Sequence, residues 1–245
     1  MTNKQFFINS LEKINITLED SQIDSFLKYY EMLVEKNKVM NLTSITEYEE
    51  VVQKHFIDSL SLVNAIDIND LSTQINILDI GTGAGFPGIP LKIAFPNINI
   101  TLLDSLNKRI NFLNDVIYEL SLNEKGKIEA VHGRAEEYIK LNNKRESFDY
   151  VVSRAVANLS TLSEYCIPYV KTDGYFIPYK SEKTSEEIEE SKVAISKLGG
   201  TIEEVIDYTI PNSDNIYRTL IKIKKTSSTP DIYPRKAGLP SKKPL

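Results

Sequence analysis

A glycine-rich turn at the end of a short apolar run constrains this chain more than any other feature. Residues 75–80 form the run, with Asp79 near its end, and Gly81, Gly83 and Gly85 follow at once. A short apolar run that ends in glycines is typical of a parallel strand buried in a sheet. Such glycines let the backbone approach a ligand where side chains would collide. The segment therefore predicts an open α/β sheet that binds a ligand at the carboxyl end of this strand.

Strand-like and helix-like patterns alternate through the rest of the chain. We expect strands at 75–80, 99–104, 127–131, 148–153, 174–179, 201–210 and 217–224, and helices at 88–95, 108–120, 159–170 and 184–198. This alternation predicts a doubly wound, Rossmann-like α/β fold with a mostly parallel sheet of these strands. The link 211–214 is too short for a crossover helix, so the last strand should be antiparallel. A seven-stranded sheet of this layout resembles that of class I methyltransferases.

The residues around the turn favour S-adenosylmethionine over a dinucleotide as the ligand. The turn reads G-x-G-x-G, whereas the NAD fingerprint is G-x-G-x-x-G. S-adenosylmethionine has an ammonium and a sulfonium instead of a pyrophosphate, so the carboxylate of Asp79 suits it. Asp104 ends the next strand, about 20 residues after the first glycine, where an acid binds the ribose hydroxyls of either cofactor. Glu136, after the third strand, is placed to meet the adenine edge. The alternative for each acid is a helix cap or a solvated charge.

Segments of different character flank the predicted sheet. Residues 1–70 should be helical, because apolar residues recur at helical spacing after Thr17, the expected cap of one helix, and again over 46–65. Residues 226–245 are basic and contain prolines that disfavour helix. We therefore divide the chain into a helical N-terminal extension (1–70), an S-adenosylmethionine-binding methyltransferase domain (71–225) and a C-terminal tail (226–245).

Composition argues against several other classes of protein. The 245 residues include one cysteine and two histidines, which speaks against disulfides, cysteine-rich zinc sites and histidine-based catalysis, and no metal site is expected. No apolar run approaches the roughly 20 residues that span a bilayer, and the N-terminus lacks the apolar core of a signal peptide. A cytoplasmic protein without a membrane partner is expected. The formal net charge of −5 argues against a surface that is basic throughout, but a local basic face stays open.

Several strings in the sequence resemble one protein family. The longest cover residues 79–90, 103–109 and 153–157, and shorter ones are Asn41-Leu42-Thr43, His55-Phe56-Ile57-Asp58-Ser59, Lys180 and Arg218. Together they span nearly the whole chain and resemble the bacterial RsmG family, also named GidB. Its members are small-subunit ribosomal RNA methyltransferases that modify N7 of one guanine in 16S rRNA. The resemblance implies 16S rRNA, within the small ribosomal subunit, as the partner of this chain, which we expect to act as a monomer.

The resemblance also implies roles for single residues. The S-adenosylmethionine pocket would be lined by Gly81, Phe86, Ala135, Glu136 and Arg154, in addition to Asp79, Gly83 and Asp104 from the argument above. Candidates for contact with the RNA or the target base are Arg134, Arg154, Lys180, Arg218, His55 and Asn41. None of these is assigned a catalytic role.

The chemistry of guanine N7 agrees with this residue set. N7 is a lone-pair nucleophile with no proton to lose, so methyl transfer needs alignment and no general base. The Asn/Asp-Pro-Pro-aromatic string typical of adenine N6 or cytosine N4 methylation is replaced by residues 153–156, and Cys166 is expected to pack inside a helix. A methyltransferase for another RNA, a protein or a small molecule is the alternative. A nicotinamide-dependent oxidoreductase and a protein that only binds the ribosome are less favoured.

His55 and the basic C-terminal segment each allow two interpretations from the sequence alone. His55 lies beside the apolar face of its predicted helix, so it is either a hydrogen-bonded structural histidine or a functional residue. From residue 222 onward the chain carries one acid, Asp231, against the bases Lys222, Lys224, Lys225, Arg235, Lys236, Lys242 and Lys243. This segment is either an unstructured solubility tail or a contact for RNA phosphates.

Overall fold

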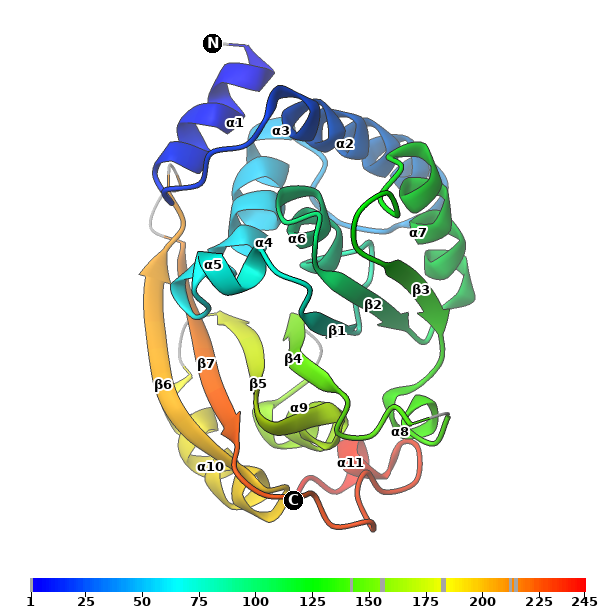
Figure 1. Cartoon of the computed structure of the whole chain (residues 1–245), viewed down its shortest axis with the longest axis vertical. Coiled ribbons are helices and arrows are strands. Elements are labelled where there is room, and N and C mark those ends of the chain that lie inside the picture. The colour runs from blue at the N-terminus through cyan, green and yellow to red at the C-terminus, as the bar shows by residue number, and fades with distance from the viewer. Residues whose placement is uncertain (1, 142, 155–156, 182–183, 212, 214–215) are drawn as a thin grey trace.

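A single seven-stranded sheet organises the chain in the order β3-β2-β1-β4-β5-β7-β6 (Figure 1). The computed structural model describes residues 2–141, 143–154, 157–181, 184–211, 213 and 216–245. The strands are β1 (Asn76–Ile80), β2 (Asn99–Asp104), β3 (Ile128–His132), β4 (Phe148–Arg154), β5 (Val170–Ser181), β6 (Gly200–Thr209) and β7 (Tyr217–Lys225). The first five strands are parallel, and β7 lies antiparallel between β5 and β6. The predicted Rossmann-like fold with an antiparallel last strand is therefore confirmed.

The strand register brings the carboxyl ends of the central strands to one edge of the sheet. Ile80 of β1 lies opposite Leu103 of β2, and Asp104 lies opposite His132 of β3. The glycine turn, Asp104 and the loop after β3 consequently meet at this edge, where open α/β sheets bind ligands.

Alternate residues of each strand serve two separate hydrophobic cores. Ile77 and Val152 belong to one core, and their neighbours Leu78 and Val151 belong to the other, as the two-residue period of a strand requires. The first core lies under α6 (Gly88–Ala94) and α7 (Asn107–Glu119), and the second under α8 (Ala135–Tyr138), α9 (Leu159–Cys166) and α10 (Ser185–Lys197). Both faces of the sheet are thus covered by helices, as in a doubly wound fold.

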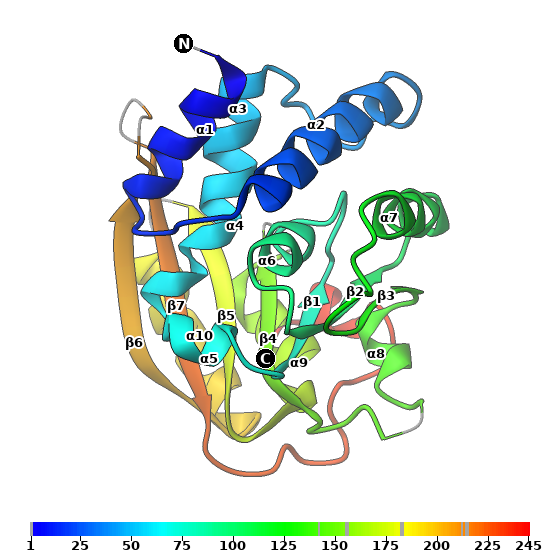
Figure 2. The same ribbon diagram turned by 45° about the horizontal axis from the view of Figure 1, so that its top comes forward.

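The N-terminal helices extend the first of these cores. Helices α1 (Asn3–Glu12) and α2 (Asp20–Met40) pack with the segment 48–64 beside α6 and α7 (Figures 1 and 2). Phe7, Phe26 and Phe56 form a triangle of rings with centroids 4.8, 5.0 and 5.8 Å apart. Aromatic rings at these separations add to the stability that their burial provides. The segment 1–70 therefore shares its hydrophobic core with the sheet.

The start of α2 differs from the prediction, so Thr17 as its cap is wrong. Helix α2 begins at Asp20, with Glu19 as its cap, and Glu19 and Gln22 satisfy each other's backbone N–H groups. The amide nitrogen of Gln22 also donates to the carbonyls of Ile93 and Ala94 at the end of α6. Gln22 thereby satisfies polar groups at the ends of two helices, which favours a helix start at Asp20 over one after Thr17.

The predicted helix 46–65 exists but is irregular. It consists of α3 (Tyr48–Val51), a π-helical stretch η1 (Val52–Ile57), α4 (Asp58–Leu60) and a 3₁₀ stretch η2 (Ser61–Asn64). A π-helical stretch within a helix is wider than an α-turn and is frequent at functional sites. Here the π-helical stretch contains His55, and Asp58 follows its last residue.

Two further expectations about segment ends are corrected. Helix α9 ends at Cys166 and a 3₁₀ turn, Ile167–Tyr169, follows, because Pro168 cannot donate a helical hydrogen bond. Strand β5 then starts at Val170, earlier than predicted.

The interpretation of 226–245 as an unstructured tail is wrong, since this segment folds back and ends in the short helix α11 (Leu239–Lys242) against α9. The residues Ala155, Val156, Asn212 and Asp214, on which parts of the sequence argument rest, lie outside the described residues.

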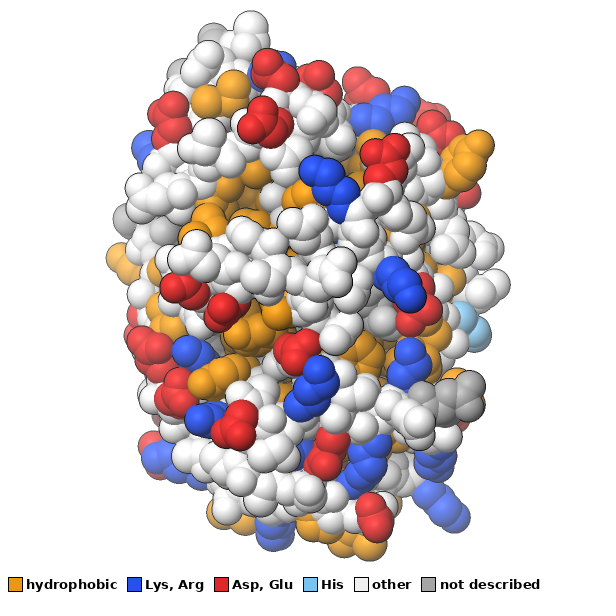
Figure 3. Space-filling view, viewed as in Figure 1, with side chains coloured by type: hydrophobic (Ala, Val, Ile, Leu, Met, Phe, Trp, Pro, Cys, Tyr) orange, Lys and Arg blue, Asp and Glu red, His pale blue; other side chains and the backbone are white. Residues whose placement is uncertain are grey.

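Charges of both signs mix on the surface. On the face drawn in Figure 3, Lys and Arg side chains are interspersed with Asp and Glu. This face is not basic throughout, in agreement with the formal net charge of −5. Any basic region for nucleic acid must therefore be local.

Replacing Phe26 by alanine should strongly destabilise the whole chain. Phe26 is fully buried among the N-terminal helices, and removal of a buried phenylalanine side chain costs about 3–5 kcal/mol of unfolding free energy. Chemical denaturation measures this loss in a single transition if the N-terminal helices and the sheet share one core. The control is Tyr118→Ala on the exposed side of α7, which should change the free energy by no more than about 0.5 kcal/mol. An equally small loss for Phe26→Ala would contradict the shared core.

Candidate functional site

The turn after β1 adopts a backbone conformation that needs glycine. Gly81, Gly83 and Gly85 have φ values of 73°, 64° and 106°, which residues with a side chain rarely adopt. A Cβ atom on Gly85 would also lie 2.5 Å from the side chain of Ile89 and 2.9 Å from the hydroxyl of Tyr29. The glycines therefore shape a turn whose backbone is unobstructed at the carboxyl end of β1.

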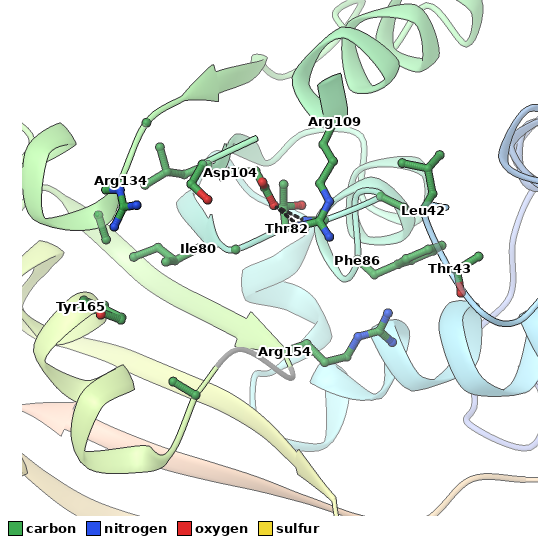
Figure 4. A pocket seen from close by; sticks show the side chains of 18 of the residues that line it. Leu42, Thr43, Ile80, Thr82, Phe86, Asp104, Arg109, Arg134, Arg154 and Tyr165 are labelled. Atoms are coloured by element: carbon green, nitrogen blue, oxygen red, sulfur yellow. Dashed lines mark hydrogen bonds and ion pairs between the residues drawn. The ribbon is translucent and has the colours of Figure 1, made fainter. Parts of the chain in front are cut away.

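A cavity of about 550 Å³ opens over this turn. Figure 4 shows Leu42, Thr43 and Phe86 at one end and Arg134 and Tyr165 at the other, with Thr82, Asp104 and Arg109 between them. Of the predicted site residues, the cavity wall contains Gly81, Gly83, Phe86, Asp104, Arg134, Ala135, Glu136, Arg154 and His55. The wall thus combines residues from the N-terminal segment, three strand ends and the C-terminal tail.

Asp104 connects the glycine turn to the end of β2. Its Oδ2 accepts hydrogen bonds from Gly83 N (2.9 Å) and from Arg109 Nη1 (3.1 Å), and its Oδ1 accepts one from Leu106 N (2.9 Å). The side chain is 2% exposed and borders the cavity. A carboxylate has about four acceptor positions, so Asp104 can hold the turn and still accept a ligand hydroxyl.

Asp79 lies behind the turn and not on the cavity wall. Its Oδ2 accepts hydrogen bonds from Thr82 Oγ1 (2.6 Å) and Gly88 N (2.9 Å). Its Oδ1 is buried and has no hydrogen-bond partner among the described residues. Burial raises the pKa of Asp79 from 3.8 to about 7, although the hydrogen bonds from Thr82 and Gly88 act in the opposite direction. In this structure Asp79 braces the turn against the start of α6.

The end of the cavity near Phe86 holds a stack of planar side chains. The ring of His55 lies on that of Phe86, with centroids 4.4 Å apart and planes 20° apart, and Arg154 Cζ is 5.1 Å from the Phe86 centroid. His55 Nε2 is 2.9 Å from Thr43 Oγ1. Burial and the charge of Arg154 lower the pKa of His55 to about 3. His55 is therefore neutral at physiological pH.

A buried carboxylate, Asp58, holds two of the candidate arginines. Its side chain is 2% exposed, and its oxygens lie 2.9 Å from Arg154 Nη1 and 3.3 Å from Arg218 Nε. The hydroxyl of Tyr208 donates to Oδ1 at 3.1 Å. Since a buried charge is strongly unfavourable without a partner, Asp58 and these guanidinium groups depend on each other. The sequence signal for this was an acid inside the predicted helix 46–65, next to apolar positions.

Arg218 is not on the cavity wall, and two further candidates, Lys180 and Asn41, also take structural positions outside it. Lys180 Nζ donates to Ala157 O (2.9 Å) and Glu187 Oε1 (2.6 Å), which ties β5 to α10 and to the start of α9. Asn41 ends α2 in the left-handed conformation, with φ 47°, a role in which asparagine is favoured after glycine. Its neighbours Leu42 and Thr43 line the cavity instead.

Tyr29 supports the glycine turn from below, which the sequence did not indicate. The fully buried hydroxyl of Tyr29 donates to Ala84 O at 2.6 Å. This bond links α2 to the turn across 55 residues of sequence. Only the folded structure reveals a contact of that kind, because no local pattern records it.

Some chemistries have no residues to support them in the described part of the chain. Cys166 is fully buried, as predicted, and burial raises the pKa of its thiol well above the ordinary value. The described residues include no group of three or more His, Cys, Asp or Glu side chains that could hold a metal ion. Nor does any described helix have the length and apolarity that crossing a bilayer requires.

Comparison with known proteins gives a consistent family. The model of the GidB family, described as rRNA small subunit methyltransferase G, matches residues 22–215. Two relatives with the name Ribosomal RNA small subunit methyltransferase G come from Lachnoclostridium phytofermentans and Clostridium novyi. They are 54% and 46% identical, and the alignments cover 100% of this chain and 98% and 100% of those proteins.

Solved structures share the fold at low sequence identity. TYW2 of M. jannaschii, in complex with AdoMet, has a TM-score of 0.50 at 14% identity, over 64% of this chain and 74% of that one. TrmN of Thermus thermophilus has a TM-score of 0.52 at 10% identity, over 71% of this chain and 53% of that one. At such identities the comparison establishes the fold alone.

Asp79→Asn should make the stability of the protein less dependent on pH. At low pH, Asp79 is protonated both in the folded protein and in the unfolded chain. As the pH rises from about 4 toward about 7, the unfolded chain ionises while the folded protein retains the proton, so the contribution of Asp79 to stability falls until its raised pKa of about 7 is passed. Asparagine can still accept the bonds from Thr82 and Gly88. The difference in Tm, variant minus parent, should therefore increase between about pH 5 and about pH 7 and level off above that.

The matched control is Glu119→Gln, an exposed carboxylate at the end of α7, measured over the same pH range. A pH-independent difference for Asp79→Asn would show that Asp79 is already ionised in the folded protein.

Proposed function

Since this chain belongs to the GidB family of rRNA small subunit methyltransferases G, we propose that it transfers a methyl group from S-adenosylmethionine to N7 of one guanine in 16S rRNA. The observation that carries the proposal is the division of one cavity into two ends. Arg134 and Tyr165 lie at the cofactor end, Asp104 and the glycine turn lie in the middle, and Phe86, with His55 and Arg154 against it, lies at the other end. Such a cavity can hold an adenosine cofactor and a base at the same time.

The residues of the cofactor end fit S-adenosylmethionine. The volume of about 550 Å³ is within the usual range for a small-molecule site. Asp104 has acceptor capacity left for a ribose hydroxyl, Glu136 offers a carboxylate to the adenine edge, and the glycine turn leaves backbone exposed between them. When bound, S-adenosylmethionine supplies an electrophilic methyl group on a sulfonium. In this proposal Asp79 acts from behind by holding the turn in place.

The opposite end of the cavity suits a purine that loses no proton. Phe86 lines this end with the ring of His55 stacked on it, and Thr43 and neutral His55 provide polar atoms. A histidine with a pKa of about 3 is a poor general base at neutral pH. Methylation of guanine N7 does not need one, because the attacking lone pair carries no proton. The alternative reactions, in which an exocyclic amine or a carbon must lose a proton, fit this end less well.

Positive charge for the RNA is concentrated around the cavity in this proposal. Arg134 is exposed at the cofactor end, and Arg218 is partly exposed behind Asp58. Lysine and arginine contacts with phosphates supply much of the affinity for nucleic acid and make it dependent on salt. We assign the cofactor to the segment 71–225 and a share of the RNA and target-base contacts to the N-terminal extension 1–70, which contributes Thr43 and His55.

The proposed reaction predicts label at a single guanine. The protein is incubated with methyl-labelled S-adenosylmethionine and small ribosomal subunits, or naked 16S rRNA, that lack the modification. We expect the label in 7-methylguanosine after nuclease digestion of the RNA, and we expect no label in the ribosomal proteins. Label transferred to protein, to a small molecule or to another atom of the RNA bases would overturn the proposal in favour of one of the alternative methyltransferases. A catalytically unrelated surface variant, Asp115→Asn, serves as the positive control.

Asp58→Asn should reduce RNA methylation at least about tenfold, because it leaves the partly buried guanidinium groups of Arg154 and Arg218 without the carboxylate that orients them. The measurement is kcat/KM for the RNA, together with Tm to detect loss of folding. Tyr208→Phe removes one hydrogen bond from a neutral hydroxyl to Asp58 and leaves the charge of Asp58 in place. It should therefore lower kcat/KM only roughly fivefold, which corresponds to about 1 kcal/mol. Equal activities for the two variants and the parent would show that orientation of these arginines does not limit the reaction.

A further inference from the structure

The C-terminal tail, residues 226–245, forms part of the wall at the cofactor end of the cavity. Ser241 lines the cavity together with Tyr165 of α9. We propose that the tip of this tail, residues 238–241, is a component of the S-adenosylmethionine site and contacts the adenine end of the cofactor. The inference rests on the proposed function, since it names the part of that cofactor which the tail contacts. The tip lies outside residues 22–215, which the family model matches.

A buried ion pair anchors the tail to the body of the protein. Glu164 of α9 is completely buried, and its carboxylate accepts from Arg235 N (2.8 Å), Nε (2.9 Å) and Nη2 (2.6 Å). A guanidinium that binds both oxygens of a carboxylate gives a strong and directional pair. Without Arg235, the charge of Glu164 would be buried alone, which is strongly destabilising. Docking of the tail is therefore built into the folded state.

Further bonds fix the path of the tail before this anchor. The guanidinium of Arg145 donates to the carbonyls of Thr229, Pro230 and Tyr233 at 2.6, 3.0 and 2.8 Å. The buried Lys225 contacts the hydroxyl of Thr229 at 2.6 Å. Because three carbonyls within five residues of the tail are held by one side chain, its course from β7 to α9 is determined.

The tip of the tail then contacts two residues of the cavity wall. Gly238 N donates to Glu136 Oε1 at 2.9 Å, and Ser241 Oγ lies 2.7 Å from the hydroxyl of Tyr165. Gly238 has a φ of 79°, and a Cβ atom there would meet nothing within 4 Å, so glycine serves the backbone conformation that directs this N–H. The tip thus orients the carboxylate of Glu136 and adds a hydroxyl beside Tyr165.

These groups match the chemistry of adenine. The base presents an amino donor next to ring-nitrogen acceptors. The wall presents a carboxylate, which only accepts, near a pair of hydroxyls, which can donate. Glu136 is the residue placed at the adenine edge on sequence grounds, and here its orientation depends on Gly238. Binding of the cofactor and docking of the tip should consequently favour each other.

Removal of the tip alone tests this inference. A chain that ends at Lys236 retains the bonds between Arg235 and Glu164 but loses Gly238 and Ser241. Its Kd for S-adenosylmethionine, measured by titration calorimetry, should rise at least about tenfold, as expected for a lost hydrogen bond to a charged group. The control is the double variant Lys242→Ala, Lys243→Ala, which removes charge beyond the tip and should leave Kd within about twofold.

A ligand that lacks the amino-acid portion of the cofactor tests which end of the cofactor the tip contacts. Truncation should weaken the binding of 5′-methylthioadenosine by the same factor as that of S-adenosylmethionine if the tip acts on the adenine end. An unchanged Kd for both ligands in a folded truncated chain would overturn the inference, and so would a loss confined to S-adenosylmethionine. If truncation impairs folding, the variants Ser241→Ala and Tyr165→Phe replace it. Each should weaken the binding of S-adenosylmethionine about threefold, as expected for the loss of a neutral hydrogen bond. An unchanged Kd in both variants would contradict the role of the tip.

Amide hydrogen exchange gives a readout other than affinity. Exchange at the tip should slow when S-adenosylmethionine is added to the full chain, whereas exchange in the exposed part of α10 should not change. A full-length chain that binds no S-adenosylmethionine would overturn the proposed function itself. Equal affinities of the full chain and the chain that ends at Lys236 for S-adenosylmethionine would overturn only the proposed role of the tip.

Discussion

The turn after β1 has glycine at three of its positions, Gly81, Gly83 and Gly85, so side chains from other parts of the chain hold its backbone in place. Three hydrogen bonds do this from three directions: Asp104 accepts from Gly83, Asp79 accepts from Gly88, and Tyr29 donates to Ala84. They originate in β2, β1 and α2. A turn supported in this way keeps its shape without a ligand, and preorganisation of that kind lowers the cost of binding. The sheet and the N-terminal helices are thus both part of the site proposed for the cofactor.

The other end of the cavity depends on a second buried carboxylate. Asp58 terminates the π-helical stretch and faces Arg154 on β4 and Arg218 on β7. The N-terminal segment therefore determines how these arginines are presented, just as α2 determines the support of the turn. Helices that precede the sheet in sequence give the cavity much of its chemistry, because Thr43, His55 and Asp58 all come from them.

Local patterns in the sequence were sufficient for the strands, the Rossmann-like fold and the antiparallel last strand. The apolar run before Gly81 and the acid at Asp104 are each read within a few residues. The contacts between Tyr29 and Ala84, Asp58 and Arg218, and Arg235 and Glu164 join positions 55 to 160 residues apart in sequence, which no periodicity records. The position of Asp79 behind the turn was likewise hidden, since a strand-end acid looks the same whether it faces the ligand or the backbone. Basic residues in the tail suggested exposure, but one of them is the partner of a buried acid.

The anchor between Glu164 and Arg235 has a consequence for the order in which the molecule is completed. Glu164 is synthesised 71 residues before its partner, so a growing chain that has already made the sheet up to β5 still contains an uncompensated acid on α9. That acid lacks its partner until Arg235 has left the ribosome, and burial of an unpaired charge is strongly unfavourable. The part of the cavity wall that Ser241 provides is therefore added after the sheet has been made. Fusions at the C-terminus would be placed next to this wall, whereas the N-terminus offers an attachment point away from it.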